Sequence, residues 1–332
     1  QDPFVVVQFG LPVIIASTLA WMETTVMMSF RGGRLQREAI PMSVARLVDR
    51  IGECKGKQQL FAQQSPQLLE SLRQCAIVQS TESSNRIEGI VVPSRKLHEL
   101  MDEKVAPANR SEGEVAGYRD VLSTIHANYK EIEPTPNIIS QLHRDLYRYV
   151  PSEGGHWKSV DNTIDDVLSD GTHVVRFHPV PAVATPLAMQ ELCDALKRHT
   201  QAEDVVPLLL VGTFVLDFLC IHPFRDGNGR MARLLALLLL YQHGYEVGRY
   251  ISLERVIEES RDSYYETLKL SSEHWHEGKH NLVPWWEYFL GTIYAAYEDF
   301  ERRVGVMSTG RGVKSALVRQ MVGRMGGEFT LT

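Results

Sequence analysis

Twelve consecutive residues, 222–233, combine side chains that could act together on a phosphate group. The run is His222-Pro223-Phe224-Arg225-Asp226-Gly227-Asn228-Gly229-Arg230-Met231-Ala232-Arg233. Glycines let backbone N–H groups turn towards an anion, and arginines bring fixed positive charge to it. A histidine can accept a proton near neutral pH. The segment therefore predicts a phosphate site with a base beside it.

Asp226 does not suit a bare phosphate, because its carboxylate would repel the anion. A divalent cation between the two groups removes this repulsion, and magnesium commonly bridges one carboxylate and substrate phosphates. Asn228 can donate a hydrogen bond to a phosphate oxygen. The chain has neither G-x-x-x-x-G-K-[ST] nor G-x-G-x-x-G, so the two commonest nucleotide loops are excluded. The sequence thus predicts a magnesium–nucleotide complex on another kind of loop.

Two apolar segments must position this loop. Residues 205–220 and 234–241 carry leucines at spacings of three and four, which predicts two buried helices. Gly244 is a typical residue for the end of the second helix. A polar loop between two core helices is the arrangement expected of a rigid functional site. A plain helix corner is the alternative, and it explains each residue singly but not the whole set.

A further amphipathic helix is predicted far upstream, beginning at Ser65-Pro66 and ending at Gly89. Proline is favoured at the first helical position, and glycine is favoured just past the last one. Glu88 is oddly placed in this helix, because a carboxylate in the last turn faces the negative end of the helix dipole. We therefore expect a positively charged partner for Glu88.

The pattern His-Pro-Phe-x-Asp-Gly-Asn-Gly-Arg-x-x-Arg resembles the signature of the Fic family, and residues 222–233 match every specified position. The resemblance implies a mainly α fold, the Fic helical bundle with a small β-hairpin flap. It also implies an activity, the transfer of AMP from ATP to a serine, threonine or tyrosine hydroxyl of a target protein, called AMPylation. Such an enzyme is a nucleotidyltransferase that uses ATP and Mg²⁺.

Carried onto this chain, the resemblance gives His222 the role of general base for the target hydroxyl. Asp226 would hold magnesium, and Arg233 would reach the γ-phosphate. The α- and β-phosphates would be cradled by Gly227, Asn228, Gly229 and Arg230. Family members that transfer phosphate or phosphocholine tend to depart from this motif, so the unsubstituted Asp226 favours AMP transfer.

Ser84-x-x-x-Glu88-Gly89 resembles the inhibitory motif Ser/Thr-x-x-x-Glu-Gly/Asn of autoinhibited Fic proteins. In those proteins the glutamate pairs with the second arginine of the signature, here Arg233, and obstructs the γ-phosphate. The motif precedes the signature, which implies the class inhibited by a helix N-terminal to the core. Ser84 and Glu88 are therefore the predicted inhibitory residues.

A β-hairpin is predicted around the turn Asp170-Gly171, where β-branched and polar residues alternate. Residues 174–181 resemble the family's flap, which could align a target by strand addition. Residues 155–158 and Ile164 resemble the segment before it. Tyr264 and Tyr265 look like family positions on the adenine side, although aromatics at helical spacing more often belong to a plain core.

We divide the chain into four regions: 1–30, an apolar extension; 31–105, an N-terminal helical region with the inhibitory helix; 106–300, the Fic catalytic core; and 301–332, a linker and the truncated start of a winged helix. Residues 105–113 are a linker by composition. The apolar extension is interpreted as non-native, with the native protein beginning near Met28. A membrane anchor is the alternative.

Composition adds expectations about location and partners. A formal charge of −6 gives no electrostatic case for broad nucleic-acid binding, so DNA binding would require a completed winged helix. The four scattered cysteines predict reduced thiols of a cytoplasmic protein. No membrane partner is expected. The histidines His274, His276 and His280 lack metal-site partners and predict a solvated loop. The resemblance leaves a homodimer open.

Two other functions remain open beside autoinhibited AMP transfer. The same site could remove AMP from a modified protein, with Glu88 positioning a water molecule instead of blocking ATP. Alternatively, the chain could be a DNA-binding regulator in which the Fic core has become a nucleotide sensor. The intact set of motif residues argues against an inert core.

Overall fold

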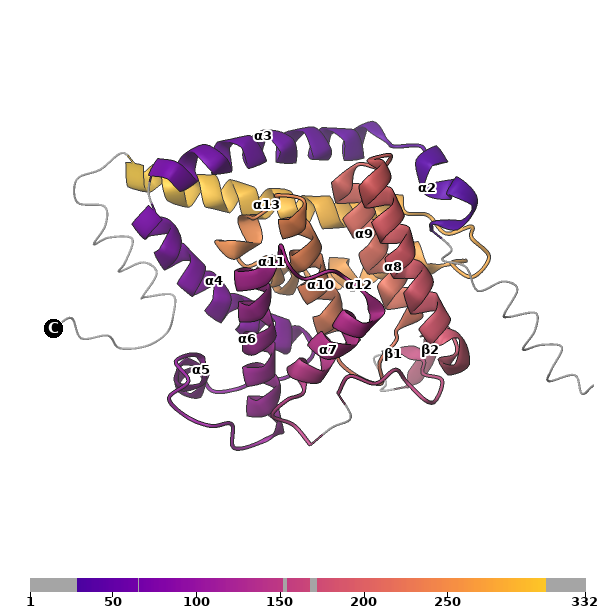
Figure 1. The fold of residues 1–332 in the computed structure, drawn as a ribbon, viewed down its shortest axis with the longest axis horizontal. Helices are drawn as coiled ribbons and strands as arrows, with labels where there is room; N and C mark the ends of the chain where they lie inside the picture. The colour runs from indigo at the N-terminus through magenta and orange to yellow at the C-terminus, as the bar shows by residue number, and fades with distance from the viewer. Residues whose placement is uncertain (1–28, 65, 152–153, 168–171, 309–332) are drawn as a thin grey trace, which may run out of the picture.

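The computed structural model describes residues 29–64, 66–151, 154–167 and 172–308. These residues form twelve α-helices, three short 3₁₀-helices and one antiparallel pair of strands (Figure 1). The mainly α fold with one small hairpin, predicted from the sequence, is confirmed.

The helices and strands span most of the described chain. In chain order the helices are α2 (Arg34–Arg37), α3 (Met42–Gln64), α4 (Pro66–Ile87), α5 (Ser94–Met101), α6 (Arg110–Asn128), α7 (Pro136–Leu146), α8 (Thr185–Ala202), α9 (Pro207–Ile221), α10 (Asn228–Gln242), α11 (Leu253–Glu259), α12 (Arg261–Ser272) and α13 (Val283–Ser308). The strands are β1 (Ile164–Val167) and β2 (His173–Phe177). The 3₁₀-helices are η1 (Arg31–Gly33), η2 (Ala182–Ala184) and η3 (Val247–Arg249).

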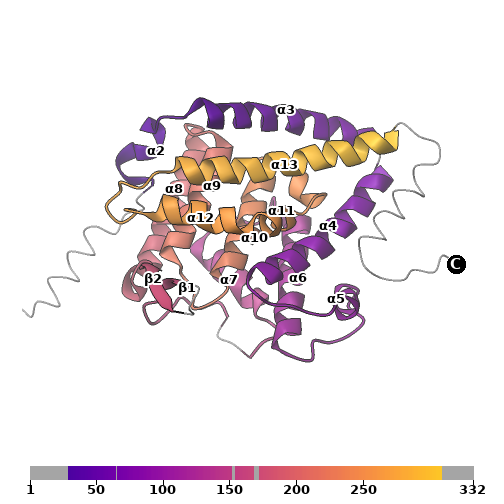
Figure 2. The ribbon, with the colours of Figure 1, turned by 180° about the vertical axis from the view of Figure 1, so that it is seen from behind.

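The two predicted apolar helices are α9 and α10, and nearly all of their side chains are buried. Helix α9 packs against α8, α10 and α13, and α10 also contacts α6 and α4. Helices α3 and α13 lie side by side along one edge of the molecule in both views (Figures 1 and 2). Because α9 and α10 are surrounded by other helices, the loop between them has rigid supports at both ends.

The predicted helix boundaries are close to those observed. Helix α4 begins at Pro66 and ends at Ile87, and Gly89 has the positive φ of +78° that favours glycine after a helix. Helix α7 begins at Pro136, with the Thr135 side chain accepting a hydrogen bond from the backbone N–H of Ile138. The sequence signals at these ends are local, which is why they are reliable here.

The predicted linker at residues 105–113 is wrong over its second half, because α6 already begins at Arg110. The Asn109 side chain accepts a hydrogen bond from Glu112 N–H at 3.0 Å, and Asn109 Nδ2 donates to the Glu112 carboxylate at 2.8 Å. This reciprocal capping is a helix-start signal that outweighs the loop-like composition.

The expected solvated loop of histidines is wrong for His280, which is only 2% exposed. Its Nε2 lies 2.8 Å from Ser29 Oγ, and its Nδ1 lies 2.8 Å from Arg34 Nη1. The Ser29 hydroxyl donates to Asp217 of α9. Long-range polar partners at the N-terminal end of the described chain therefore bury this histidine.

Several expectations concern residues outside the described part of the chain. The apolar extension lies almost wholly within residues 1–28, and the winged-helix start lies within residues 309–332. Helix α13 runs past residue 300, where the sequence predicts a linker, and reaches Ser308. Among the described helices, none has the length and apolar character needed to cross a bilayer. Cys54, Cys75, Cys193 and Cys220 are all free thiols.

Candidate functional site

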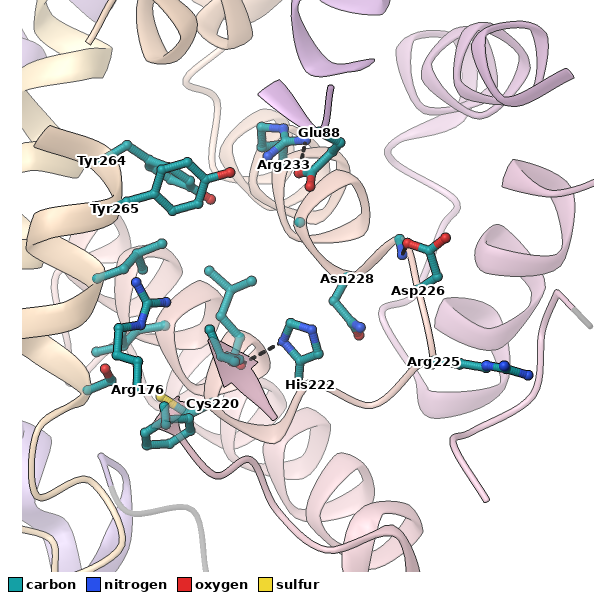
Figure 3. A pocket seen from close by; sticks show the side chains of 18 residues that line it. Glu88, Arg176, Cys220, His222, Arg225, Asp226, Asn228, Arg233, Tyr264 and Tyr265 are labelled. Carbon is teal, nitrogen blue, oxygen red and sulfur yellow. Dashed lines mark hydrogen bonds and ion pairs between the residues drawn. The ribbon is translucent and has the colours of Figure 1, made fainter. Parts of the chain in front are cut away.

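A pocket of about 190 Å³ opens at the loop between α9 and α10 (Figure 3). Seven of the predicted site residues line it: Glu88, His222, Asp226, Gly227, Asn228, Gly229 and Arg233. Ser84 and Arg230 do not line it. The structure thus brings Glu88, which follows α4 and lies 134 residues upstream of His222, into the same cavity as the loop.

His222 is the first residue after α9 and adopts the left-handed conformation, with φ of +49° and its N–H donating to Phe218 O. Its ring Nδ1 is 3.3 Å from Leu219 O, and a carbonyl can only accept, so Nδ1 carries the hydrogen. The other ring nitrogen, Nε2, keeps its lone pair. Burial lowers the pKa of His222 to about 4, so the imidazole is neutral at pH 7 and able to take a proton.

The loop is closed by Asn228 and Gly227. Asn228 Oδ1 accepts from Phe224 N–H at 2.9 Å, and Asn228 Nδ2 donates to Phe224 O at 2.8 Å. Gly227 has φ of +78°, and a Cβ there would lie 2.9 Å from the Tyr147 hydroxyl. The side chain of Asn228 therefore shapes the loop, and its predicted contact with a phosphate stays a prediction.

His143 of α7 supports the loop from behind, which the sequence analysis missed. Its Nδ1 accepts from Gly155 N–H at 2.9 Å, so its Nε2 carries the hydrogen and donates to Asp226 O at 3.0 Å. The ring stacks on Phe224 with centroids 3.6 Å apart. Burial lowers the pKa of His143 to about 4, which keeps this arrangement neutral.

Lys158 and Asn162 hold the carbonyl groups around His222. Lys158 Nζ donates to Ile221 O at 3.0 Å and to Asn162 Oδ1 at 2.7 Å, and Asn162 Nδ2 donates to Phe224 O at 3.2 Å. Burial lowers the pKa of Lys158 to about 8. The ammonium group lies at the C-terminal end of α9, where a positive charge is favourable. In the sequence, Lys158 is marked only by its place in residues 155–158, which resemble the segment before the family's flap.

Asp226 presents an accessible carboxylate at the pocket. Its Oδ1 accepts from Gly227 N–H at 2.7 Å, and its Oδ2 lies 3.1 Å from Arg110 Nη2, while the side chain is 57% exposed. Within the described residues no group of three or more His, Cys, Asp and Glu side chains could hold a metal ion. A magnesium ion on Asp226 would therefore take its other ligands from a nucleotide and water, which such ions accept.

Arg230 is enclosed by the protein and does not line the pocket. Its Nη1 donates to Glu114 Oε2 at 2.7 Å, its Nη2 donates to the Tyr147 hydroxyl at 2.8 Å, and its side chain is 1% exposed. Glu114 is 4% exposed and is also 2.6 Å from Arg110 Nε. This buried ion pair joins α10 to α6, and a phosphate role for Arg230 stays a prediction.

Glu114→Ala is expected to lower the free energy of unfolding by about 3–5 kcal/mol, because it leaves the Arg230 charge buried without its partner. Urea denaturation measures the loss. Arg110→Ala is the matched control, since it removes the exposed partner of the same carboxylate and should cost less than about 1 kcal/mol. Equal losses in both variants would show that the buried ion pair contributes no more to the free energy of unfolding than the exposed one.

Glu88 and Arg233 form the ion pair expected from the sequence, with Glu88 Oε1 2.8 Å from Arg233 Nη2 (Figure 3). Arg233 also donates from Nε to Ser84 Oγ at 2.8 Å and from Nη2 to Ser84 O at 2.9 Å. Its Nη1 is buried and has no hydrogen-bond partner among the described residues. That free donor suits a ligand oxygen.

Gly229 explains how the Glu88 carboxylate fits. A Cβ at Gly229 would collide with Glu88 Oε1, so the carboxylate lies against the backbone of the second residue of α10. The N-terminal end of a helix favours an anion there. Glu88, which faces the unfavourable end of its own helix, is thus compensated by Arg233 and by the favourable end of α10.

The hairpin forms one wall of the pocket through Ile164, Arg176 and Phe177. Strands β1 and β2 are antiparallel, with an irregularity between Ile164 and Asp165. The predicted turn, Asp170-Gly171, lies outside the described residues. Tyr264 and Tyr265 of α12 also line the pocket, and they lie across it from Asp226 (Figure 3).

Comparison with known families and proteins gives a consistent result. Residues 133–240 match the Fic/DOC family. A protein adenylyltransferase Fic of Drosophila grimshawi is 28% identical over 192 residues, which are 56% of this chain and 36% of the relative. A Fido domain-containing protein of Dictyostelium discoideum is 39% identical over 62 residues, which are 19% of this chain and 39% of the relative. The chain thus spans little more than a third of these curated relatives.

Solved structures share the fold. A Fic family protein from Desulfovibrio desulfuricans superposes with a TM-score of 0.67 and 23% identity, covering 86% of this chain and 85% of that one. Fic-1 from C. elegans gives a TM-score of 0.62 and 20% identity, covering 80% and 73% of the two chains. The likeness extends well beyond residues 133–240 and includes most of the described helices.

Proposed function

We propose that this chain, in which residues 133–240 are a Fic/DOC domain, transfers AMP from ATP to a serine, threonine or tyrosine hydroxyl of a target protein. One observation carries the proposal: a neutral histidine, an accessible carboxylate, a free guanidinium nitrogen and a helix N-terminus meet in one pocket. The curated relatives named protein adenylyltransferase support the same activity.

The proposed reaction is a displacement at the α-phosphorus of ATP. The target oxygen forms a bond to that phosphorus, the bond to the oxygen that bridges the α- and β-phosphates breaks, and pyrophosphate leaves. The hydroxyl proton passes to His222 Nε2, the ring nitrogen that keeps its lone pair. A positioned base of this kind contributes about 10²–10⁴-fold to the rate.

The phosphates would lie at the start of α10. Backbone N–H groups around Gly229 and the free Nη1 of Arg233 are donors that such a chain of phosphates needs. Asp226 would hold Mg²⁺, which neutralises phosphate charge when it is bound. The ion pair between Arg110 and Asp226 Oδ2 would have to break when the magnesium ion binds.

Asp226→Asn is expected to weaken binding of ATP with Mg²⁺ about tenfold or more, because the residue would lose its charge towards the metal. Calorimetry with ATP, in Mg²⁺ and in EDTA, measures the difference in the Glu88→Gly background. Arg110→Ala is the control: it removes the same ion pair but keeps the carboxylate, so it should retain the Mg²⁺ dependence. Identical Mg²⁺ dependence in Glu88→Gly and in Glu88→Gly/Asp226→Asn would contradict the assignment.

We further propose that the site is autoinhibited by Glu88. Its carboxylate pairs with one guanidinium nitrogen of Arg233 and lies against Gly229. It thereby fills the place that the γ-phosphate of ATP would occupy. With Glu88 in place the pocket of about 190 Å³ is smaller than the roughly 300–1,000 Å³ of common ligand sites. The docked α4 therefore leaves too little room and too few free donors for a productively bound ATP.

Removal of AMP from a modified protein is a second candidate, favoured by the presence of Glu88 and His222 in one pocket. A carboxylate there could orient a water molecule towards a phosphorus atom. Incubation with an AMPylated protein separates the two: release of AMP that depends on Glu88 supports the second candidate.

A further inference from the structure

A buried carboxylate without a cation lies between α4 and the core. Glu254 of α11 is 1% exposed, and its partners among the described residues are hydroxyl groups. Ser80 Oγ donates to Glu254 Oε2 at 2.7 Å, the Tyr118 hydroxyl donates to Oε1 at 2.9 Å, and Ser252 Oγ lies 3.3 Å from Oε2. Each donor matters, because a buried carboxylate that lacks hydrogen bonds is strongly unfavourable.

Ser80 is the only one of these donors on α4. It is 1% exposed and precedes Glu88 by eight residues, about two helical turns. A second contact between the same helices pairs Arg86 Nε with Glu258 Oε1 at 2.9 Å. Helix α4 packs mainly against α6 and α11, and only slightly against α10. The place of α4 is therefore set by contacts with α11 and α6 rather than by the phosphate loop.

The contacts of Glu88 itself do little to fix the position of its carboxylate. It follows the last residue of α4, its side chain is 32% exposed, and Arg233 is its one ion-pair partner among the residues that the structure describes. Where its carboxylate lies thus depends on where α4 docks. Ser84, which contacts Arg233, is one turn from Ser80 on the same helix.

We propose that Ser80 and Glu254 are positioning residues that hold α4 in place and so keep Glu88 on Arg233, an inference that rests on the proposed autoinhibited AMP transfer. Loss of the Ser80 hydroxyl leaves Glu254 with one donor fewer and loosens α4 at the turn that precedes Ser84. Glu88 then leaves the pocket more often, although the residue itself is unchanged.

Ser80→Ala tests this directly. It is expected to raise AMP transfer about 3- to 10-fold. This is less than the full free energy of one hydrogen bond to a charged group would give, because Tyr118 and Ser252 remain as partners of Glu254. In the Glu88→Gly background the same substitution should change nothing. A residue that only stabilises the fold would lower or leave activity in both backgrounds, so dependence on Glu88 identifies positioning.

Ser71→Ala is the matched control, since Ser71 is an exposed serine of α4 that donates to Gln67 O of its own helix. Amide hydrogen exchange over residues 81–88 gives a readout without activity and should be faster in Ser80→Ala alone. Unchanged exchange and unchanged transfer overturn the proposal. Glu254→Gln replaces Ser80→Ala if the latter fails to fold, and the same results are expected. If Glu88→Gly itself transfers no AMP, the proposed function fails, while exchange still tests the anchor.

Discussion

Glu88→Gly is expected to raise the transfer of AMP from ATP to protein by about 10- to 100-fold, a coupling typical of regulatory contacts. The substitution removes the carboxylate that pairs with Arg233 and frees the space beside Gly229. Glycine is tolerated at this position because α4 ends at Ile87. Labelling of protein with radioactive ATP measures the change.

Two further variants separate the ion pair from effects on the helix. Glu88→Ala should behave like Glu88→Gly, because both remove the carboxylate. Glu82→Ala should behave like the unsubstituted protein, because the partly exposed Glu82 carboxylate contacts Arg86 at 3.4 Å rather than Arg233. Unchanged labelling in both Glu88 variants would remove the case for autoinhibition by this residue.

His222→Ala in the Glu88→Gly background is expected to lower AMP transfer by about 10²–10⁴-fold, the range for loss of a general base. Binding of ATP should be nearly unchanged, because the phosphate donors come from α10. His222 is neutral at pH 7, so removing it changes little of the charge in the pocket. Initial rates and calorimetry measure the two quantities.

His156→Ala is the control for this loss, since His156 is an exposed histidine near the loop that lies outside the pocket of His222. It should retain full transfer. A His222→Ala protein that keeps its rate would assign the proton to another group and contradict the proposed reaction.

The loop and its two flanking helices could be predicted because their signals are contiguous in the sequence. Leucine spacing predicted α9 and α10, and residue types predicted a phosphate site between them. The pairing of Glu88 with Arg233 needed the family resemblance, since nothing local joins two residues 145 positions apart. The helix dipole alone indicates only that Glu88 needs a positively charged partner.

The residues that support the loop could not be predicted in the same way. His143, Lys158 and Asn162 act on backbone carbonyls that the fold brings to them, so no spacing in the sequence marks them. Glu114 is different, because the capping pattern Asn109-x-x-Glu112 predicts the start of α6 and places Glu114 in its second turn. The loop-like composition of residues 105–113 suggested a linker instead, so this helix start was not predicted.

The position of the label in ATP tests the central claim most directly. The Glu88→Gly protein is incubated with Mg²⁺, a cell lysate and ATP labelled either at the α- or at the γ-phosphate. Autoinhibited AMP transfer predicts protein labelled from α-phosphate only, with the label strongly reduced in unsubstituted protein and lost in Glu88→Gly/His222→Ala. Label from the γ-phosphate, or none from the α-phosphate in a folded Glu88→Gly protein, would contradict it.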